Sequence, residues 1–308
     1  MNADEISARD KAEVISIKNM IAPPGLVPDF PPNLAKARAG HDGLARIFPV
    51  LKGTDCTPII LGGIRAEKIM PPATTSARTI LYLHGWGYAL GSITSHRHLV
   101  AQLAQASFAT AYCLDYRLAP EAPFPAAIED GVLAYYALLE MGVLSSDIVI
   151  VGDSSGGGLA VAVALALKQR AIVQPAGLFL MSPWVDLSLT GASVDANAAT
   201  DFMCNKAELA HWAHLYAGAA HGLNPNASPL NADLTGLPPT LIHAGSEEIL
   251  LSDSTRLAER LGLAGVSVTL MIAAHMPHTF HYMWPFLTAA REAIGDAGDW
   301  IVNLRPSA

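Results

Sequence analysis

The sequence predicts an α/β protein with a doubly wound, mostly parallel sheet and a helical cap. First, short apolar runs alternate with helical segments of about 10 to 15 residues from residue 79 onward, a rhythm typical of βα units around a parallel sheet. Second, the β-branched run 148–151 leads through a glycine-rich turn into an Ala/Leu/Val-rich helical segment. Third, residues 1–47 and 190–235 interrupt the rhythm, so we expect them to form the cap over the carboxyl ends of the strands. The α/β domain itself then comprises residues 48–189 and 236–308.

The N-terminal part has a helical pattern, and strands follow it. Apolar residues near one face predict a helix over 3–21, prolines between 23 and 32 end it, and a short helix is expected over 33–47. Strand patterns begin within 51–70, and the further expected strands cover 79–83, 109–114, 148–151, 176–182, 240–243 and 266–272. The further expected helices cover 95–106, a segment that ends near 141, 159–170, 206–219, 251–263, 283–294 and 300–304. In open α/β sheets the chemistry lies on loops at the carboxyl ends of the strands.

Composition indicates a globular protein without a charged macromolecular partner. Of the 308 residues, 51% are hydrophobic and 15% are charged, which suits a packed core and not a disordered chain. The net charge of −8 and the lack of a Lys/Arg cluster argue against nucleic acid or an anionic membrane surface as a partner.

The expected location is the cytoplasm. The three cysteines, Cys56, Cys113 and Cys204, are far apart, which favours buried thiols in a reducing compartment over a disulfide framework. Residues 1–10 carry charged side chains and no apolar core of a signal peptide. The longest apolar run, 156–167, is too short to span a bilayer.

Ser154 is the candidate nucleophile. It stands between strand and helix in the spacing Gly152-x-Ser154-x-Gly156, which places a serine on a sharp, strained turn. Glycine on both sides leaves room for the neighbouring strand and helix, and the helix N-terminus directs free N–H groups toward the serine. The alternative is a turn that only packs or binds phosphate, although the spacing is not G-x-G-x-x-G and no P-loop lysine follows. Other segments must decide between the two.

A base is expected among three histidines that follow the last predicted strand, His275, His278 and His281. A serine nucleophile needs a base, and the base needs an acid that orients it; in this arrangement the chain order is Ser, then Asp or Glu, then His. The same histidines at zinc-like spacing are an alternative, but Pro277 interrupts any helix that would align them, and no acidic or Cys ligand stands nearby. We therefore expect no metal, and a surface or core role for any two of the three.

The acid is expected just after the strand 240–243. Glu247 and Glu248 lie in the loop at that point, whereas Asp253 already belongs to the next helix. Paired acids at the start of a helix also complement its dipole. The residues alone therefore do not decide which of the two glutamates orients the base.

Backbone donors for an oxyanion are expected in two places. One is the residue after the nucleophile, Ser155, and the other is the loop after strand 79–83, which reads His84-Gly85-Trp86-Gly87. Negative charge builds on the carbonyl oxygen during attack, and loss of one such donor costs roughly 3 to 4 kcal/mol.

Together these motifs resemble the hormone-sensitive-lipase-like family of bacterial esterases, also called family IV, within the α/β-hydrolase superfamily. The motifs that carry the resemblance are His84-Gly85-Trp86-Gly87, Tyr116-Arg117-Leu118-Ala119-Pro120-Glu121, Phe124-Pro125-Ala126-Ala127, Gly152-Asp153-Ser154-Ser155-Gly156-Gly157, Ser182-Pro183-Trp184-Val185-Asp186-Leu187, Gly245-Ser246-Glu247-Glu248-Ile249-Leu250 and His278-Thr279-Phe280. They span about residues 50 to 300 in the order of the family.

The resemblance assigns roles to individual residues. It implies that Ser154 is the nucleophile, that His278 is the base, and that Glu248 is the acid, because Glu248-Ile249-Leu250 occupies the place of the family's Asp-Pro-Leu. It also implies that the oxyanion N–H groups come from Gly85, Trp86 and Ser155. Trp86 departs from the glycine that the family nearly always has there.

The function that follows is a serine carboxylesterase for short-chain, soluble carboxylic esters, working through an acyl-enzyme without a cofactor. A lactone hydrolase is the nearest alternative, because lactones need the same triad. Receptors on the same fold bind a ligand without hydrolysis, but they lack the histidine base that His278 provides here. The expected partners are a small-molecule ester and, from the resemblance, a second copy in a homodimer, with no nucleic acid or membrane.

Apolar residues of the cap and of the oxyanion segment are the candidates for substrate binding. They are Trp86, Phe30, Phe202, Met203 and Trp212. A stripe at helical spacing such as Leu209, Trp212 and Tyr216 is more often core than pocket. For Trp86 two roles are open: a rigid wall at the mouth of the pocket, or packing between cap and sheet.

Overall fold

The fold is an eight-stranded sheet in the order β1-β2-β4-β3-β5-β6-β7-β8. The computed structural model describes residues 3–22, 30–219, 222 and 224–304. The strands are β1 (Asp55–Leu61), β2 (Ile64–Met70), β3 (Thr79–Leu83), β4 (Thr110–Leu114), β5 (Ile148–Asp153), β6 (Gly177–Met181), β7 (Thr240–Gly245) and β8 (Val268–Ala273). Strand β2 pairs antiparallel with β1 and β4, and the other pairs are parallel. The predicted fold class is therefore confirmed.

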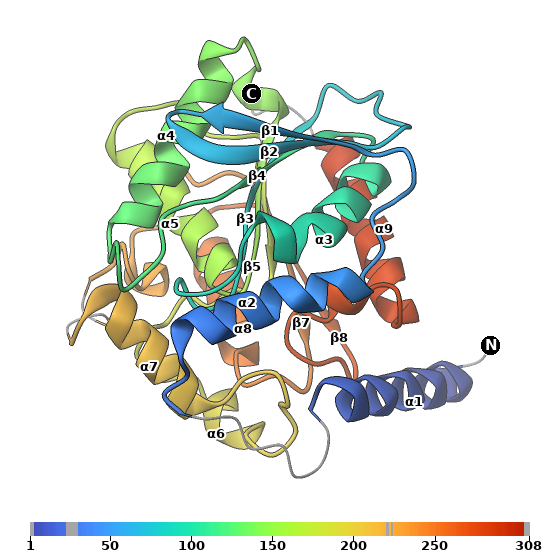
Figure 1. Cartoon of the computed structure of the whole chain (residues 1–308). Coiled ribbons are helices and arrows are strands. Elements are labelled where there is room, and N and C mark those ends of the chain that lie inside the picture. Colours follow the sequence, from blue (N-terminus) through green and yellow to red (C-terminus); the bar gives the residue numbers. More distant parts are fainter. Residues whose placement is uncertain (1–2, 23–29, 220–221, 223, 305–308) are drawn as a thin grey trace.

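Helices cover both faces of this sheet (Figure 1). One face carries α3 (Ile93–Ala106) and α9 (Thr288–Asn303), which share a core with the side chains on that side of the sheet. The other face carries α4 (Ala126–Glu140), α5 (Ser155–Gln169) and α8 (Leu251–Leu263), which enclose a second core. The central strands β3, β5 and β6 are buried throughout, which is the pattern of parallel strands covered on both sides.

The two segments that interrupt the βα rhythm lie on the same side of the molecule (Figure 1). The first segment, residues 1–47, contains α1 (Ala3–Ile21), α2 (Leu34–Leu44) and the 3₁₀ turn η1 (Ala45–Ile47). The second segment, residues 190–235, contains α6 (Ser193–Ala196), α7 (Lys206–Ala217) and the turn η4 (Pro229–Asn231). The segments touch where the Phe30 ring meets His211 of α7 at 5.4 Å between centroids and where Lys18 Nζ lies 5.8 Å from the Phe202 ring.

The C-terminal helices expected over 283–294 and 300–304 are wrong, because the chain forms the short turn η5 (Phe280–Met283) and then the single helix α9. Gly298 lies within α9, where this helix crosses α3. A Cβ at Gly298 would come within 2.5 Å of the Ala106 carbonyl oxygen, so glycine permits close packing there and does not end the helix.

The helix after Ser154 also begins earlier than expected. It starts at Ser155 and includes the three glycines 156–158, although glycine is a poor helix former. A Cβ at Gly156 would lie 2.0 Å from the Leu83 carbonyl oxygen, so packing against β3 outweighs the local propensity. Among the helices that the structure describes, none is both long and apolar enough to cross a membrane.

Candidate active site

Ser154 occupies a strained turn between β5 and α5. Its backbone has φ 53° and ψ −122°, a conformation that costs a non-glycine residue about 1–3 kcal/mol and is typical of functional sites. Two neighbours hold it there: the Ser154 N–H donates to the Met181 carbonyl oxygen at 2.8 Å, and the Ser154 carbonyl oxygen accepts from the Trp184 N–H at 2.9 Å. The strain is thus maintained by β6 and by the residues that follow it.

His278 and Glu248 form a buried pair. The distance between His278 Nδ1 and Glu248 Oε2 is 3.1 Å, and the exposed fractions of the two residues are 4% and 0%. Glu248 follows β7 and His278 follows β8, as the order Ser, acid, His requires. A carboxylate at this nitrogen holds the ring in the tautomer that leaves Nε2 free to accept a proton.

Adjacent strands bring the serine and this pair together. Strands β5, β6, β7 and β8 are consecutive parallel neighbours, so the loops that hold Ser154, Glu248 and His278 leave the same edge of the sheet. Ser182, at the end of β6, lies between them: its N–H donates to the His243 carbonyl oxygen at 2.7 Å, and its Oγ accepts from the Thr279 N–H at 3.0 Å.

The surroundings of His278 favour its protonated form. Burial opposes the charge, but Cys204 and the Glu248 carboxylate together raise the pKa of His278 well above its ordinary value. Burial also raises the pKa of the Cys204 thiol and that of the Glu248 carboxyl. A raised pKa gives His278 a higher affinity for the proton that it takes. It also means that His278 can act as a base only at a pH above this pKa.

The other acidic candidates have different partners. Glu247 is half-exposed, and its Oε1 lies 3.8 Å from His275 Nδ1. Asp253 is buried in α8 and accepts the N–H groups of Val185 and Asp186, both at 2.9 Å. Burial raises the pKa of Asp253 to about 7. Of the three acids, only Glu248 lies against a histidine ring within hydrogen-bond distance.

The two remaining histidines of the cluster also lie elsewhere. His275 Nε2 is 3.1 Å from the hydroxyl of Ser7 on α1. His281 Nε2 is 3.1 Å from His243 Nδ1 in a buried, stacked pair, and burial lowers the pKa of His281 well below its ordinary value. Within the described residues, no group of three or more His, Cys, Asp or Glu side chains is arranged to hold a metal ion.

The oxyanion loop, residues 85–88, differs from the expectation at one donor. The Gly85 N–H donates to Asp153 Oδ1 at 3.0 Å, which makes Gly85 unavailable as a donor and corrects the prediction from the sequence. The Tyr88 N–H donates to Ser155 Oγ at 3.2 Å. Within the described part of the chain, the N–H groups of Trp86, Gly87 and Ser155 have no acceptor.

The Asp153 carboxylate connects the oxyanion loop with two further side chains. Besides Gly85, it accepts the Tyr82 hydroxyl at 2.7 Å, and His96 Nε2 lies 3.4 Å from its second oxygen. Burial would raise the pKa of Asp153, but His96 and the hydrogen bonds hold it below its ordinary value. The residue stands inside the serine motif, which was the only sequence signal for its role.

Left-handed backbone runs through the oxyanion loop, with φ values of 76° at Trp86, 65° at Gly87 and 61° at Tyr88. Helix α2 contacts the loop through His41, whose ring centroid is 3.8 Å from that of Trp86. Helix α7 also contacts the loop. Its Trp212 ring lies so close to Gly87 that a Cβ at Gly87 would come within 2.8 Å of the ring. The Tyr216 ring of α7 stacks on Tyr88 at 3.7 Å. Both segments therefore support the loop.

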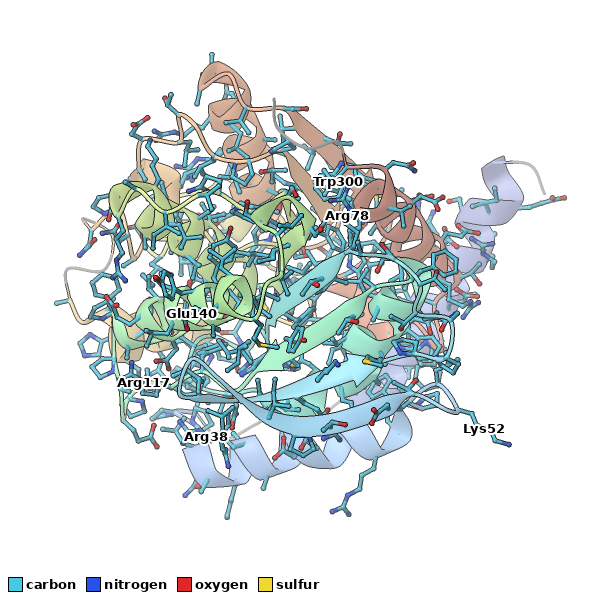
Figure 2. All side chains as sticks on the ribbon, turned by 90° about the horizontal axis from the view of Figure 1, so that it is seen from above. Arg38, Lys52, Arg78, Arg117, Glu140 and Trp300 are labelled. Atoms are coloured by element: carbon cyan, nitrogen blue, oxygen red, sulfur yellow. The ribbon has the colours of Figure 1, made fainter. Side chains whose placement is uncertain are left out.

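Helix α2 is anchored beside the oxyanion loop by Arg38, which Figure 2 labels. The guanidinium donates to the carbonyl oxygens of Ala89 at 2.9 Å and Ala119 at 3.0 Å. It also pairs with both oxygens of Glu121, at 2.7 and 2.8 Å. These residues belong to the loops that follow β3 and β4, so α2 is connected to the catalytic part of the sheet.

The residues expected to bind substrate have mixed surroundings. Phe30 is half exposed, and Phe202 and Met203 are partly buried against the core that α3 and α9 share. Trp212 is buried against the oxyanion loop. The indole of Trp86 lies between His41 and Tyr282, the latter at 6.3 Å between centroids, which supports a packing role between the first segment and the α/β domain.

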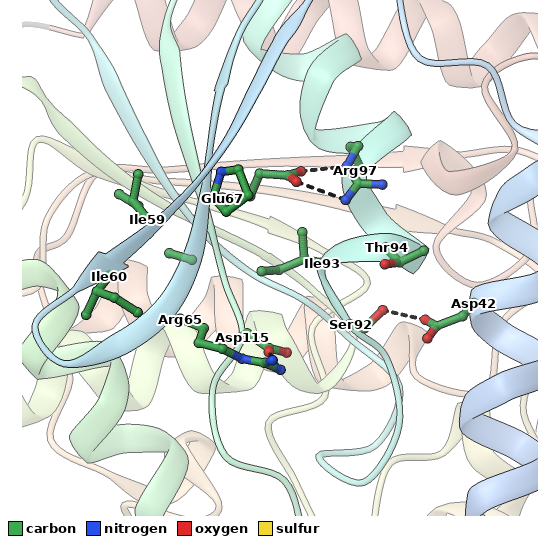
Figure 3. Close-up of a pocket in the computed structure, with 12 residues that line it drawn as sticks. Asp42, Ile59, Ile60, Arg65, Glu67, Ser92, Ile93, Thr94, Arg97 and Asp115 are labelled. Carbon is green, nitrogen blue, oxygen red and sulfur yellow. Dashed lines mark hydrogen bonds and ion pairs between the residues drawn. The ribbon is translucent and has the colours of Figure 1, made fainter.

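A hollow of about 620 Å³ opens between α2, the β1–β2 hairpin and the start of α3 (Figure 3). Ser92 donates to Asp42 at one end of it, and Arg97 pairs with both oxygens of Glu67 at 2.6 and 2.9 Å. Its remaining lining residues are Pro58, Ile59, Ile60, Arg65, Ala66, Ile93, Thr94 and Asp115. None of the candidate triad residues lines this hollow, so it is separate from the active site.

An eight-stranded sheet with a strained serine turn after β5 and a His–carboxylate pair after β7 and β8 is the arrangement of an α/β-hydrolase. The family model described as alpha/beta hydrolase fold matches residues 80–282. The chain belongs to this family and, within it, to the hormone-sensitive-lipase-like bacterial esterases. It is a carboxylic ester hydrolase.

Similar proteins agree with this placement. An acetyl-hydrolase of Streptomyces hygroscopicus is 43% identical over 264 residues, which cover 86% of this chain and 88% of that protein. An esterase of Acinetobacter venetianus is 38% identical over 270 residues, covering 85% and 87%. The crystal structure of a hormone-sensitive lipase from a metagenome library has a TM-score of 0.88 at 44% identity and covers 96% of this chain and 98% of its own.

Proposed function

We propose that the protein is a serine carboxylesterase that hydrolyses short-chain carboxylic esters through a triad of Ser154, His278 and Glu248. The observation that carries the proposal is the buried pair of His278 and Glu248, 3.1 Å apart, at the edge of the sheet where Ser154 is held in a strained conformation. The name of the acetyl-hydrolase relative and a similar esterase structure soaked with p-nitrophenyl butyrate, at 37% identity, support short acyl groups.

In the proposed reaction, Ser154 Oγ attacks the ester carbonyl carbon while His278 takes the hydroxyl proton. His278 passes this proton to the leaving alcohol, and the C–O bond to the alcohol breaks to give an acyl-serine. Water then attacks the acyl carbon, with its proton again taken by His278, and the acid leaves as Ser154 is reprotonated. Glu248 orients the ring and stabilises its charged form in both halves of the reaction.

The oxyanion in each half is proposed to accept hydrogen bonds from the N–H groups of Trp86, Gly87 and Ser155. Gly85 is excluded because its N–H donates to Asp153. Preorganised donors of this kind are usually the largest single contribution to catalysis of acyl transfer. The two helical segments are proposed to act as a cap over the strand ends, in agreement with the contacts of His41 and Trp212 with the oxyanion loop.

The test is a panel of p-nitrophenyl esters from acetyl to palmitoyl, with lactones alongside, on the wild type and on Ser154→Ala. We expect activity to be highest on the short esters and to fall by at least ~10³-fold in kcat in Ser154→Ala, as when one member of a triad is removed. Ser155→Ala is the comparison: it keeps the backbone N–H and loses only the hydroxyl that accepts from the Tyr88 N–H, so its loss of kcat should be much smaller than that of Ser154→Ala. Preference for lactones, or an active Ser154→Ala, would contradict the proposal.

Two further predictions from the sequence concern assembly and location. A homodimer is expected from the resemblance, and sedimentation of the purified protein tests it. The cytoplasmic location remains a prediction from the cysteine usage and the N-terminal sequence.

A further inference from the structure

Side chains of the second segment hold the loop that carries Glu248. We call residues 246–249 the acid loop. Asn197 Nδ2 donates to two of its carbonyl oxygens, those of Ser246 at 3.0 Å and Glu248 at 2.9 Å. The other two carbonyl oxygens, of Glu247 and Ile249, accept from the hydroxyls of Thr200 at 3.1 Å and Ser193 at 2.6 Å. Every carbonyl of the acid loop is therefore bound by this segment.

Asp201 extends the same network from the acid loop to the base. Its Oδ2 accepts the N–H of Ile249, the residue after Glu248, at 2.8 Å. Its Oδ1 accepts the N–H groups of Met203 at 2.8 Å and Cys204 at 2.9 Å. Cys204 in turn is one of the groups that raise the pKa of His278. One carboxylate thus connects the backbone beside the acid with the residue that faces the base.

The α/β domain supplies the other side of the acid loop. The N–H of Ser246 donates to the Ala273 carbonyl oxygen at 2.9 Å, and that of Glu247 donates to the Met276 carbonyl oxygen at 3.1 Å. These bonds fix the loop against the chain after β8. The Glu248 carbonyl oxygen also accepts from the Leu251 N–H at 3.3 Å, whereas the carbonyl oxygens of Ser246, Glu247 and Ile249 and the Ile249 N–H have their partners, among the described residues, in the second segment. The glutamate side chain has three rotatable bonds, so its carboxylate meets His278 reproducibly only if the backbone below it is fixed.

We propose that Asn197 and Asp201 are positioning residues of the ester hydrolysis, which hold the acid loop so that Glu248 orients His278. This inference rests on the proposed triad and goes beyond it, because it makes the second segment part of the catalytic support as well as a cover. Neither residue contacts the reacting atoms. Both act through the backbone of the acid loop.

The experiment compares Asn197→Ala and Asp201→Asn with two matched controls from the same segment. Asn226→Ala removes an exposed amide that accepts from Gln169, and Asp195→Asn removes an exposed partner of Lys206; neither touches the acid loop. For all four variants, kcat and KM on p-nitrophenyl acetate, the pH profile and the urea midpoint are measured. We expect kcat to fall by about 10- to 100-fold in the first two variants, with KM within about 3-fold, as for a misplaced catalytic group. The controls keep the wild-type values.

The pH profile separates positioning from stability. The titratable groups facing His278 are Glu248 and Cys204, and Asp201 adds its charge near Glu248. Asn197→Ala changes no charge. If it displaces Glu248 from His278, the pKa of His278 falls, and the acid limb of kcat/KM should lie at lower pH than in the wild type. In Asp201→Asn the loss of a negative charge would by itself move the acid limb to lower pH. Asn197→Ala is therefore the variant whose pH profile decides.

A folded Asn197→Ala enzyme with unchanged kcat and unchanged acid limb would overturn the inference. A lower urea midpoint with wild-type kcat per folded molecule would overturn it as well, because it would show only a structural role. If Asn197→Ala does not fold, kcat per folded molecule and the urea midpoint of Asp201→Asn decide in its place, because this variant keeps one carbonyl oxygen for Met203 and Cys204; a wild-type kcat per folded molecule would then overturn the inference. An active Ser154→Ala refutes the triad itself, so the two failures remain distinguishable.

Discussion

The acid loop and the oxyanion loop are both shaped by the segments outside the sheet, but by different forces. Side-chain hydrogen bonds from residues such as Asn197 and Asp201 hold the acid loop. Aromatic rings hold the oxyanion loop, His41 against Trp86 and Tyr216 against Tyr88. Hydrogen bonds fail when one partner changes polarity, whereas ring contacts depend on shape and area. The acid loop should therefore be sensitive to isosteric polar changes, and the oxyanion loop to changes of volume.

The largest effect is expected at the acid itself. Glu248→Ala should lower kcat by about 10²- to 10⁴-fold, because the buried His278 loses the group that orients it. Glu247→Ala should stay within ~10-fold, since Glu247 is half-exposed and its neighbour is His275. Steady-state kinetics on one short ester checks both, and the reverse ranking would assign the acid to Glu247.

Asp253 is a control for the effect of burial, because it is a buried acid like Glu248 but does not contact His278. Asp253→Ala should lower the free energy of unfolding, since it removes the oxygen that accepts the N–H groups of Val185 and Asp186. The expected loss is about 1–3 kcal/mol, with little change in kcat of the folded enzyme. Urea unfolding together with kinetics on the folded fraction tests it, and a large loss of kcat alone would move the acid to Asp253.

The pH dependence tests the same pair. Cys204 and Glu248 raise the pKa of His278 against the effect of burial, so the neutral base, and with it the activity, should be lost as the pH falls through that raised value. Glu248→Gln keeps the shape but removes the charge, which lowers the pKa of His278. The acid limb of kcat/KM should therefore move to lower pH while the maximum falls. A limb that stays in place would show that another group titrates.

The sequence predicted the parts of the site that follow from strand order. The proposed triad residues Ser154, Glu248 and His278 all stand at strand ends, although the choice of Glu248 over Glu247 came from the family resemblance and not from the residues alone. Two features had no such signal. Whether Gly85 is a free donor depends on Asp153, which is 68 positions away, and the acid-loop contacts of Asn197 come from a polar segment without a motif. Contacts between distant segments are set by packing, which local sequence does not report.

A smaller effect is expected from the ring contact of α2 on the oxyanion loop. Burial lowers the pKa of His41 to about 4, so its ring is neutral near pH 7 and contacts the Trp86 indole without a charge. His41→Ala should lower kcat about 3- to 10-fold and the free energy of unfolding by about 0.5–1.5 kcal/mol, the usual range for an aromatic pair. His41→Phe keeps a ring there and should restore both. Kinetics and urea unfolding of both variants test this. If His41→Phe loses as much activity and stability as His41→Ala, a polar interaction of His41 matters and not its ring.

The smallest effect on activity is expected from Trp86→Gly, alone and combined with His41→Ala. Trp86 has φ 76°, a left-handed conformation that costs a residue with a side chain about 1–2 kcal/mol and that the contact with His41 helps to maintain. Glycine adopts it without strain and keeps the N–H. The single variant should therefore hold kcat within about 3-fold, although the lost indole contacts should lower the free energy of unfolding by about 1–3 kcal/mol.

The combination shows whether the two residues act together. In the Trp86→Gly background, His41→Ala should have no further effect on kcat, because the loop no longer needs the ring to hold its backbone. A double-mutant cycle measures this coupling. If the two effects on kcat simply multiply, His41 acts on the hole without Trp86. If instead Trp86→Gly folds but is inactive, the tryptophan side chain itself sets the loop geometry, and a gain on bulkier esters would identify it as a wall of the pocket.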